Sequence, residues 1–221
     1  MLELRHLSKS YPTPQGPLSV LRHIDLHLAA GESLALMGES GCGKSTLLHL
    51  AAGLDTPDAG EVRLHGEALS ALDEPARARL RRERQGLVFQ QFHLVPSLNL
   101  ADNLSLQARL AGREDAAWNR ELLGRLGLAG MAGRYPEQLS GGQQQRLAIG
   151  RALAARPALL LADEPTGNLD ENSADEVLAL LLALVRDKGC ALLMVTHSPR
   201  VAAPLDRRVT LSHGRIERGP A

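Results

Sequence analysis

The residues best suited to chemistry lie in a glycine-rich stretch near the start of the chain. It reads Gly38-Glu39-Ser40-Gly41-Cys42-Gly43-Lys44-Ser45 and is followed by Thr46. Glycines let successive backbone N–H groups turn inward as a nest for an anion, and a following helix points its positive end at the same place. Lys44 is placed to reach the β- and γ-phosphates of a nucleotide, and the Ser45 hydroxyl to ligate Mg²⁺. The pattern predicts a phosphate-binding loop, and its setting between an apolar stretch and a helix disfavours an accidental glycine-rich turn.

A second candidate is a pair of acids, Asp163 and Glu164, directly after the apolar run 158–162. A strand that ends in an acid places a carboxylate at the carboxyl edge of a sheet, beside a phosphate loop. We expect Asp163 to hold Mg²⁺ through water, and Glu164 to polarise the water that attacks the γ-phosphate. The alternative is two solvated acids at the end of a strand, and the phosphate loop upstream favours the catalytic interpretation.

A third candidate is Leu139-Ser140-Gly141-Gly142-Gln143, which opens a pattern typical of a helix. Ser140 is a natural N-cap, and the glycines permit close approach of a backbone, so this is a second helix start suited to an anion. Two such starts with one nucleotide-sized pocket favour a head-to-tail dimer, in which each Ser140 helix caps the γ-phosphate held by the other chain. An ordinary glycine-rich cap is the alternative.

The elements around these motifs predict an α/β fold. Apolar runs without alternation, typical of strands covered on both faces, occupy 33–37, 158–162 and 191–195. Helical patterns at 45–52 and about 173–188 follow the first two, which predicts a mostly parallel sheet covered by helices. Alternating stretches at 2–11 and 18–28 predict half-buried strands near the N-terminus, and 208–217 predicts a hairpin that turns at His213-Gly214.

The middle of the chain differs, because 95–155 shows helical patterns and no convincing buried strand. We interpret it as a helical subdomain inserted into an α/β core formed by 1–94 and 156–221. The whole chain, 1–221, is then a single domain.

Composition narrows the class of protein. Hydrophobic residues make up 44% of the 221 residues, enough for a substantial core. The formal net charge is zero, which weighs against a nucleic-acid partner. No stretch approaches the roughly 20 apolar residues that cross a bilayer, and the N-terminus lacks the pattern of a signal peptide. Two cysteines, Cys42 and Cys190, make no disulfide framework and suit a reducing compartment. We therefore expect a soluble, cytoplasmic protein.

Taken together in order and spacing, these motifs resemble the ABC ATPase family. The resemblance adds Asn168-Leu169-Asp170 and the lone His197 after a strand, and it covers essentially the whole chain. It implies a P-loop NTPase core of the RecA-like type, with an antiparallel β subdomain and an inserted α-helical subdomain, that binds ATP with Mg²⁺.

The resemblance also implies roles for single residues. Tyr11 would stack on adenine, and Gln90 would sense the γ-phosphate and Mg²⁺ and relay that state to a membrane partner. Asp170 would bridge two chains, and His197 would hold the γ-phosphate and position the water. The implied catalytic residues are Glu164, His197, Gln90 and Lys44. The implied nucleotide contacts are Tyr11, Gly38, Glu39, Ser40, Gly41, Cys42, Gly43, Lys44, Ser45, Thr46, Ser140, Gly141, Gly142, Gln143 and Asp170. The implied metal contacts are Ser45, Gln90 and Asp163.

Finer features look like one branch of that family, the lipoprotein-release and macrolide-export ATPases. These features are 164–170, Gln90-Gln91-Phe92 and the run 140–146. The resemblance implies an ATP-sandwich homodimer that drives an integral membrane permease subunit and lies on the inner face of the cell membrane through that partner. Two alternatives stay open: the ATPase of a small-solute importer, and an ABC protein that acts on ribosomes or DNA ends.

Two patches are open to a structural and a functional interpretation. Five arginines between 77 and 84 form either a solvated helix face or a contact with lipid headgroups or a partner. An apolar cluster follows Gln90 and forms either subdomain core or a groove for a short helix of the membrane subunit; it consists of Phe92, Leu94, Val95, Leu98 and Leu100. Cys42 adds a thiol beside the phosphates, and we expect its alkylation to inhibit the enzyme.

Overall fold

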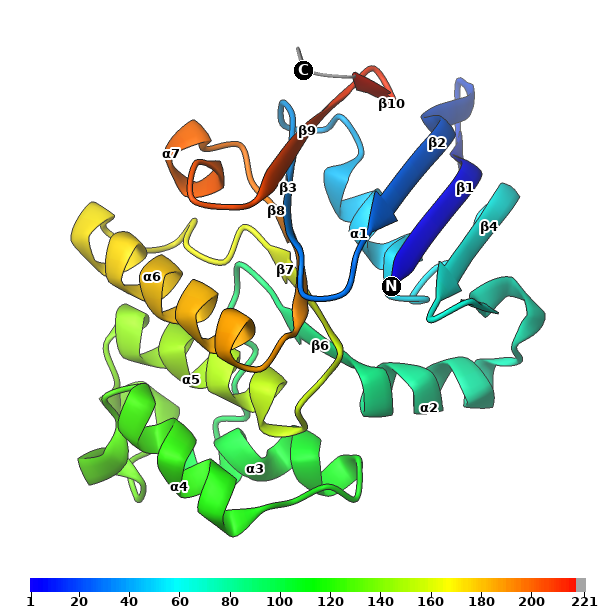
Figure 1. Cartoon of the computed structure of the whole chain (residues 1–221). Helices are drawn as coiled ribbons and strands as arrows, with labels where there is room; N and C mark the ends of the chain where they lie inside the picture. The colour runs from blue at the N-terminus through cyan, green and yellow to red at the C-terminus, as the bar shows by residue number, and fades with distance from the viewer. Residues whose placement is uncertain (218–221) are drawn as a thin grey trace. The chain divides into compact units, whose positions relative to one another are not determined.

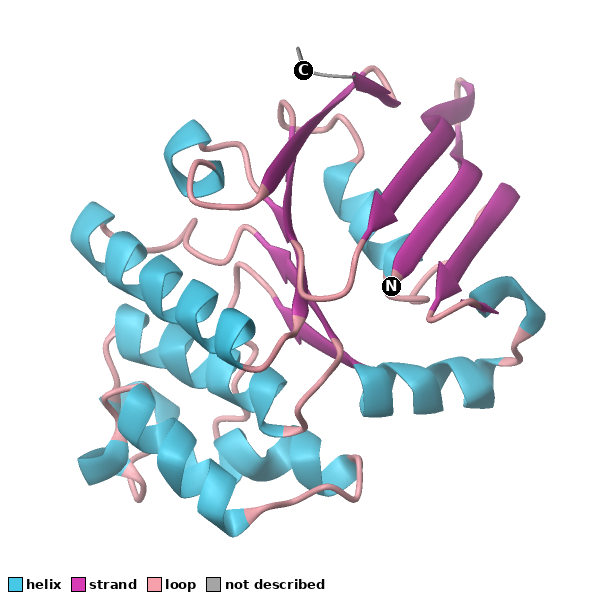
Figure 2. Cartoon of the chain, in the orientation of Figure 1, coloured by secondary structure: helices cyan, strands magenta, loops and turns pink. Residues whose placement is uncertain are grey.

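The computed structural model describes residues 1–217 (Figure 1). The described residues form two compact units, one of residues 1–81 with 191–217 and the other of residues 82–190. Strands and helices occur in both units (Figure 2). Among the described residues, no helix is long and apolar enough to span a bilayer.

The first unit begins with an antiparallel sheet in the order β2-β1-β4-β5. Its strands are β1 (Leu2–Thr13), β2 (Gly16–Leu28), β4 (Ala59–Leu64) and β5 (Glu67–Ala68). β1 lies between β2 and β4, as Figure 1 shows, and its leucines alternate inward: Leu2, Leu4 and Leu7 are at most 2% exposed. This confirms the predicted antiparallel β subdomain.

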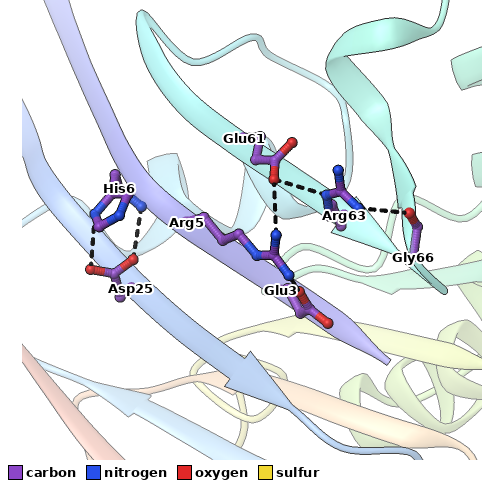
Figure 3. A network of polar contacts seen from close by, with 7 residues as sticks. All are labelled: Glu3, Arg5, His6, Asp25, Glu61, Arg63 and Gly66. Carbon is purple, nitrogen blue, oxygen red and sulfur yellow. Dashed lines mark hydrogen bonds and ion pairs between the residues drawn. The ribbon is translucent and has the colours of Figure 1, made fainter.

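The outward face of this sheet carries ion pairs and hydrogen bonds across the strands (Figure 3). Arg5 contacts Glu3 at 2.5 Å and Glu61 at 3.4 Å, and Arg63 contacts the same Glu61 at 2.8 Å. His6 on β1 is bonded to Asp25 on β2: the Asp25 carboxylate accepts the His6 backbone N–H at 2.8 Å. Exposed pairs of this kind contribute about 0–1 kcal/mol each, so they add little to the stability that burial of the opposite face provides.

The same unit holds four neighbouring strands of a mixed sheet, in the order β10-β9-β3-β8. Its strands are β3 (Ser33–Met37), β8 (Ala191–Val195), β9 (Arg207–Ser212) and β10 (Arg215–Glu217). β3 pairs in parallel with β8 and β9, and β10 returns antiparallel to β9. The predicted turn at His213-Gly214 is confirmed: both residues have positive φ, 46° and 74°, as a two-residue hairpin turn requires.

Helices α1 (Lys44–Ala51) and α7 (Pro199–Ala202) and the 3₁₀ turn η1 (Leu69–Ala71) complete the regular structure of this unit. Helix α2 (Glu74–Arg84) carries the arginine run and has no buried residue, which agrees with a solvated helix face. Two of its arginines turn back on the chain: Arg77 and Arg81 both bind Glu74, and Arg81 donates to Gly53 O at 2.6 Å. Contact of this helix with lipid or a partner stays a prediction.

The second unit contains the parallel pair β6 (Gln85–Val88) and β7 (Leu159–Asp163) with the long helices. The helices are α3 (Leu100–Leu110), α4 (Ala116–Arg125), α5 (Gly141–Ala154) and α6 (Glu171–Asp187), with 3₁₀ turns η2 (Ala129–Met131) and η3 (Pro136–Gln138). The stretch 95–155 contains helices and turns and no strand, as expected. The predicted subdomain boundaries at 94/95 and 155/156 stay a prediction.

Asn103 organises the start of this helical stretch. Its side chain is fully buried, accepts the Val95 N–H at 2.8 Å and donates to Val95 O at 3.0 Å and Leu98 O at 2.8 Å. It thereby fixes the apolar cluster predicted after Gln90, in which Leu100 is fully buried and the other four members are half-buried. The structure accounts for Leu100 as core, and a docking role for the remaining residues stays a prediction.

Candidate nucleotide-binding site

The phosphate-binding pattern lies where β3 passes into α1. β3 is apolar and buried at Leu34, Ala35 and Leu36, each 0% exposed, so the loop that follows starts from a fixed strand end. Three loop glycines have positive φ, 151° at Gly38, 79° at Gly41 and 107° at Gly43. Gly43 is the N-cap of α1, so the start of the helix carries no side-chain cap and its first N–H groups face the loop.

Close backbone packing also requires two of these glycines. A Cβ on Gly38 would lie 2.3 Å from Leu211 O, and one on Gly43 would lie 2.9 Å from Val20 Cγ1. The loop is therefore closely bounded by β9 on one side and β2 on the other. This gives it one defined shape, which is the property that a phosphate cradle needs.

Lys44 is the buried cation of this loop. It is 8% exposed, and its Nζ donates to Gly38 O at 2.7 Å and Glu39 O at 2.8 Å. Both acceptors are neutral carbonyls, so the charge of the ammonium is not neutralised by them and is available to an anion at the loop. Ser45 is exposed and Thr46 half-buried on the first turn of α1, directly after the loop.

Parallel pairing brings His197 to the edge where the phosphate loop begins. β3 and β8 run in register from Ser33 opposite Leu192 to Leu36 opposite Val195, and Thr196 N donates to Leu36 O at 3.1 Å. His197 is therefore the exposed residue that follows β8 at the carboxyl edge, next to the strand end that leads into Gly38. The following residue, Ser198, caps α7 through Val201 N at 3.4 Å.

Tyr11 lies near the end of β1 in the same unit. It is 36% exposed, and its hydroxyl donates to Asp55 Oδ2 at 2.8 Å. The first unit thus brings together Tyr11, the loop 38–46 and His197.

In the second unit, Asp163 is the last residue of β7 and Glu164 follows it directly. β6 and β7 are in register up to Val88 opposite Ala162, so Asp163 and the residues just after β6 lie at the same edge. Glu164 has a φ of 45°, a conformation that L-residues adopt at a cost of about 1–3 kcal/mol when the surroundings enforce it.

Gln90 is held against the segment that follows Glu164. Its Nε2 donates to Asn168 Oδ1 at 3.0 Å, and Asn168 Nδ2 donates back to Gln90 O at 2.9 Å. Gly167 lies against this pair, since a Cβ added to Gly167 would come within 3.1 Å of Gln90 Nε2. The sequence singled out both residues and gave no indication that they bond each other.

Ser140 is confirmed as the N-cap of α5. Its hydroxyl accepts the Gln143 N–H at 3.3 Å, and Gln143 Oε1 accepts the Ser140 N–H at 2.9 Å, which makes a reciprocal capping box. Asp170 caps α6 by accepting the Ser173 N–H at 3.0 Å, and hydrogen bonds from Ser173 lower the pKa of its carboxyl. The two helix starts are neighbours, since a Cβ on Gly142 would lie 3.5 Å from Ser173 Cβ.

Gln145 is a residue that sequence reasoning missed. It is fully buried on α5, and its Nε2 donates to Pro165 O at 2.5 Å and Phe89 O at 3.5 Å. It therefore links the helix that starts at Ser140 to the residues beside Glu164 and Gln90. A polar residue on the buried face of a predicted amphipathic helix was the signal that could have identified it.

The predicted site residues thus fall into two groups, one in each unit. The first contains Tyr11, the loop 38–46 and His197, and the second contains Gln90, Ser140–Gln143, Asp163, Glu164 and Asp170. Comparison with known proteins gives a family context for both groups. Residues 21–167 match the family model described as ABC transporter.

Two curated relatives match along the whole chain. The lipoprotein-releasing system ATP-binding protein LolD of Maricaulis maris is 47% identical over 98% of this chain and 96% of its own length. The macrolide export ATP-binding/permease protein MacB of Salmonella typhi is 45% identical over 100% of this chain, which corresponds to 34% of MacB. Among solved structures, a dimeric post-hydrolysis state of the ATP-binding cassette MJ0796, bound to ADP and Pi, superimposes with a TM-score of 0.89. It is 36% identical and covers 99% of this chain and 97% of that chain.

Proposed function

This chain belongs to the ABC transporter family, as an ATP-hydrolysing cassette of the lipoprotein-release and macrolide-export type, and from that premise we propose how its residues bind ATP, hydrolyse it and drive a membrane partner. The observation that carries the proposal is the phosphate loop, with positive φ at three glycines and the buried ammonium of Lys44 inside it.

ATP binding begins at this loop. The N–H groups of 38–46 and the start of α1 surround the phosphates, and Lys44 exchanges its carbonyl partners for the β- and γ-phosphate oxygens. Tyr11 offers its exposed ring to the adenine. Both contributions come from the first unit.

Mg²⁺ suits the oxygen donors among the predicted residues. This ion favours one or two carboxylates together with hydroxyl, water and phosphate oxygens, which matches the Ser45 hydroxyl, the Asp163 carboxylate and the Gln90 amide oxygen. When bound, Mg²⁺ neutralises charge on the β- and γ-phosphates. Asp163 would act through water, and Gln90 would report the state of the γ-phosphate through its bonds to Asn168.

Hydrolysis rests on Glu164 and His197. Glu164 accepts the proton of the attacking water, and His197 holds the γ-phosphate and keeps that water in line. The position of Glu164 directly after β7, at the carboxyl edge of the parallel pair of β6 and β7, supports this assignment.

The active form is proposed to be a homodimer with two bound ATP molecules. The Ser140 helix start of each chain caps the γ-phosphate held by the other chain, with Gly141, Gly142 and Gln143 beside it and Asp170 bridging the chains. The capping box at Ser140 supports this, since it fixes the exposed start of α5 in a shape that can receive an anion. The dimeric state of the MJ0796 cassette supports it independently.

We further propose an integral membrane permease subunit as the partner. MacB, by its name, joins an ATP-binding and a permease part in one chain, and this chain matches 34% of MacB. A separate permease subunit would supply what MacB carries in the remainder of its chain. The protein would then lie at the inner face of the cell membrane through that subunit, and we expect no nucleic-acid partner.

Glu164→Gln tests the hydrolytic part of the proposal. Loss of the general base should slow ATP hydrolysis about 10²–10⁴-fold and leave ATP binding intact, so the variant should collect as an ATP-bound dimer. Light scattering with Mg-ATP should give twice the mass seen without nucleotide. Glu176→Gln, an exposed glutamate on α6, is the matched control. Retained turnover in Glu164→Gln would show that another residue is the base.

The partner is tested by purifying the Glu164→Gln chain with Mg-ATP from detergent-solubilised cells of its own organism. A membrane protein with few spans and a large extracytoplasmic domain is the expected companion. A permease with many spans would indicate ordinary solute transport, and ribosomal or DNA-associated companions would contradict the proposed partner.

A further inference from the structure

A partly buried ion pair lies beside Tyr11. Lys9, on β1 two residues before Tyr11, is 8% exposed, and its Nζ donates to Asp55 Oδ1 at 2.9 Å and to Thr56 O at 2.8 Å. Asp58 adds a second carboxylate at 3.9 Å from the same nitrogen. These partners hold the enclosed Lys9 ammonium in place, and Asp55 is the nearer of the two acids.

Asp55 uses both of its carboxylate oxygens. Oδ1 accepts from Lys9 and from the Thr56 N–H at 2.7 Å, and Oδ2 accepts from the Tyr11 hydroxyl at 2.8 Å. Burial alone would raise the pKa of Asp55, and the hydrogen bonds from Lys9 and Tyr11 outweigh it and lower that pKa. The hydrogen bond to Asp55 raises the pKa of Lys9. Both groups are therefore charged near neutral pH.

This arrangement fixes the ring of Tyr11 in two ways. The phenol donates a hydrogen bond to Asp55, and Lys9 Nζ lies 5.1 Å from the ring centroid. An exposed tyrosine near a hairpin turn would otherwise sample several rotamers. Here one face is held by the protein and the 36% of the residue that remains exposed is kept in one orientation.

The same contacts connect Tyr11 to the phosphate loop. Asp55, which accepts the Tyr11 hydroxyl, follows the C-terminus of α1, and the N-terminus of α1 is the loop residue Lys44. Because α1 is one rigid element, the ring is held at a set separation from the place where the phosphates bind. The unit thus carries an aromatic ring and a phosphate loop, the two features that a ligand with a flat base and phosphates would need.

We propose that Asp55, together with Lys9, is a positioning residue for nucleotide binding, which holds the Tyr11 ring ready to stack on the base. The inference rests on the proposed function, in which Tyr11 is the adenine platform. Preorganisation lowers the entropic cost of binding and acts alike on the ground state and the transition state. Loss of Asp55 should therefore raise KM for ATP and leave kcat nearly unchanged.

The test is a double-mutant cycle of Asp55→Ala and Tyr11→Phe, read as KM and kcat of ATP hydrolysis. Each single change removes the same hydrogen bond, so each should raise KM about fivefold to tenfold, and the double variant should add less than twofold to the larger effect. Asp55→Asn retains an acceptor for the phenol and should recover much of the KM. Additive single effects, or a fall in kcat that accounts for the loss, would overturn the proposal.

Two measurements separate positioning from damage to the fold. Inhibition by inorganic tripolyphosphate, which has no base, should be as strong in Asp55→Ala as in the native chain. Asp58→Ala removes a carboxylate that contacts Lys9 and the Ser10 N–H and does not touch Tyr11, so it should not reproduce the effect on KM. Weaker inhibition by tripolyphosphate in Asp55→Ala, or an equal effect of Asp58→Ala, would contradict the inference.

The variant Tyr11→Ala separates failure of the positioning role of Asp55 from failure of the proposed role of Tyr11 as the adenine platform. If Tyr11→Ala leaves KM unchanged, the assignment of Tyr11 as the adenine platform is wrong. If Tyr11→Ala raises KM while Asp55→Ala and Tyr11→Phe do not, the platform stands and the positioning role of Asp55 is overturned.

Discussion

At the scale of single side chains, the two cysteines differ in what surrounds them. Cys42 is half-buried within the phosphate loop, whereas Cys190 is 2% exposed and burial raises the pKa of its thiol to about 12. Since the thiolate is the reactive form, only Cys42 should react with an alkylating agent near neutral pH.

Alkylation should therefore modify Cys42 alone and abolish ATP hydrolysis, because the added group would lie among the N–H groups that bind phosphate. Peptide mass spectrometry identifies the modified thiol, and ATPase assays follow the loss. Cys42→Ser should hydrolyse ATP and resist the reagent, and prior ATP should protect the native chain. Full activity after quantitative labelling of Cys42 would refute the prediction.

The Lys9–Asp55 pair has a defined pH dependence. The pKa of Asp55 is lowered in the folded chain, so its contribution is present above the unfolded value of about 3.9 and is lost as pH falls through the lower folded value. The pKa of Lys9 is raised, so its contribution is present below about 10.4 and is lost as pH rises through the higher folded value. The ion pair should therefore stabilise the fold throughout the pH range between these two folded pKa values.

Asp55→Asn should therefore lower the free energy of unfolding at pH 7, and the difference from the native chain should be smaller at an acidic pH below the lowered folded pKa of Asp55, where the carboxylate is protonated. Urea denaturation at both pH values measures it. Glu67→Gln, an exposed acid on β5, should show no such trend. An equal difference at both pH values would mean that the ion pair is not its source.

At the scale of elements, Gln145 joins α5 to the ends of β6 and β7. Gln145→Leu keeps the approximate volume and removes the bonds to Phe89 O and Pro165 O. We expect kcat to fall at least tenfold, because the change removes the common support of Glu164 and Gln90. KM for ATP should stay within about twofold, because the phosphate loop is not altered. Stopped-flow phosphate release provides kcat.

Gln144→Leu, on the neighbouring and half-buried position of α5, is the matched control. An equal fall in kcat in both variants would show that the effect comes from the helix in general. Unchanged kcat in Gln145→Leu would show that the link has no part in catalysis.

The elements also show what could be read from the sequence. Strands β3 and β8 match their predicted ranges, because a short, wholly apolar run has few alternatives. The sequence analysis missed β4 and β5. The His65-Gly66 turn between them has two positive φ angles, 52° and 80°, as does the predicted turn at His213-Gly214. β6 was missed because its four residues begin with Gln85 and carry no periodicity; the pairing with β7 defines it.

The candidate site, like the fold, could be predicted in part from the sequence. Ser140 as N-cap and Asp163 at the end of β7 followed from spacing alone, since each depends on a few adjacent residues. The partners of Tyr11 and Gln90 did not, because Asp55 and Asn168 lie 44 and 78 residues away in the chain. Contacts that tertiary structure creates leave no local pattern in one sequence.

At the scale of the whole molecule, the central claim is that one chain does not complete its own active site. The phosphate loop and Ser140 belong to different compact units of the chain, and the proposal pairs each loop with the Ser140 of a second copy. A variant defective in Lys44 and a variant defective in Ser140 should then complement each other, since a mixed dimer retains one site with both residues intact.

The most direct measurement is ATP trapped by mixed chains in a Glu164→Gln background. Lys44→Ala chains and Ser140→Arg chains, each alone, should trap almost none, whereas an equal mixture should form dimers that hold a single ATP. Retention of ATP by the mixture and not by either variant alone is the result that we predict. A mixture that traps no more than its separate components would contradict the shared site.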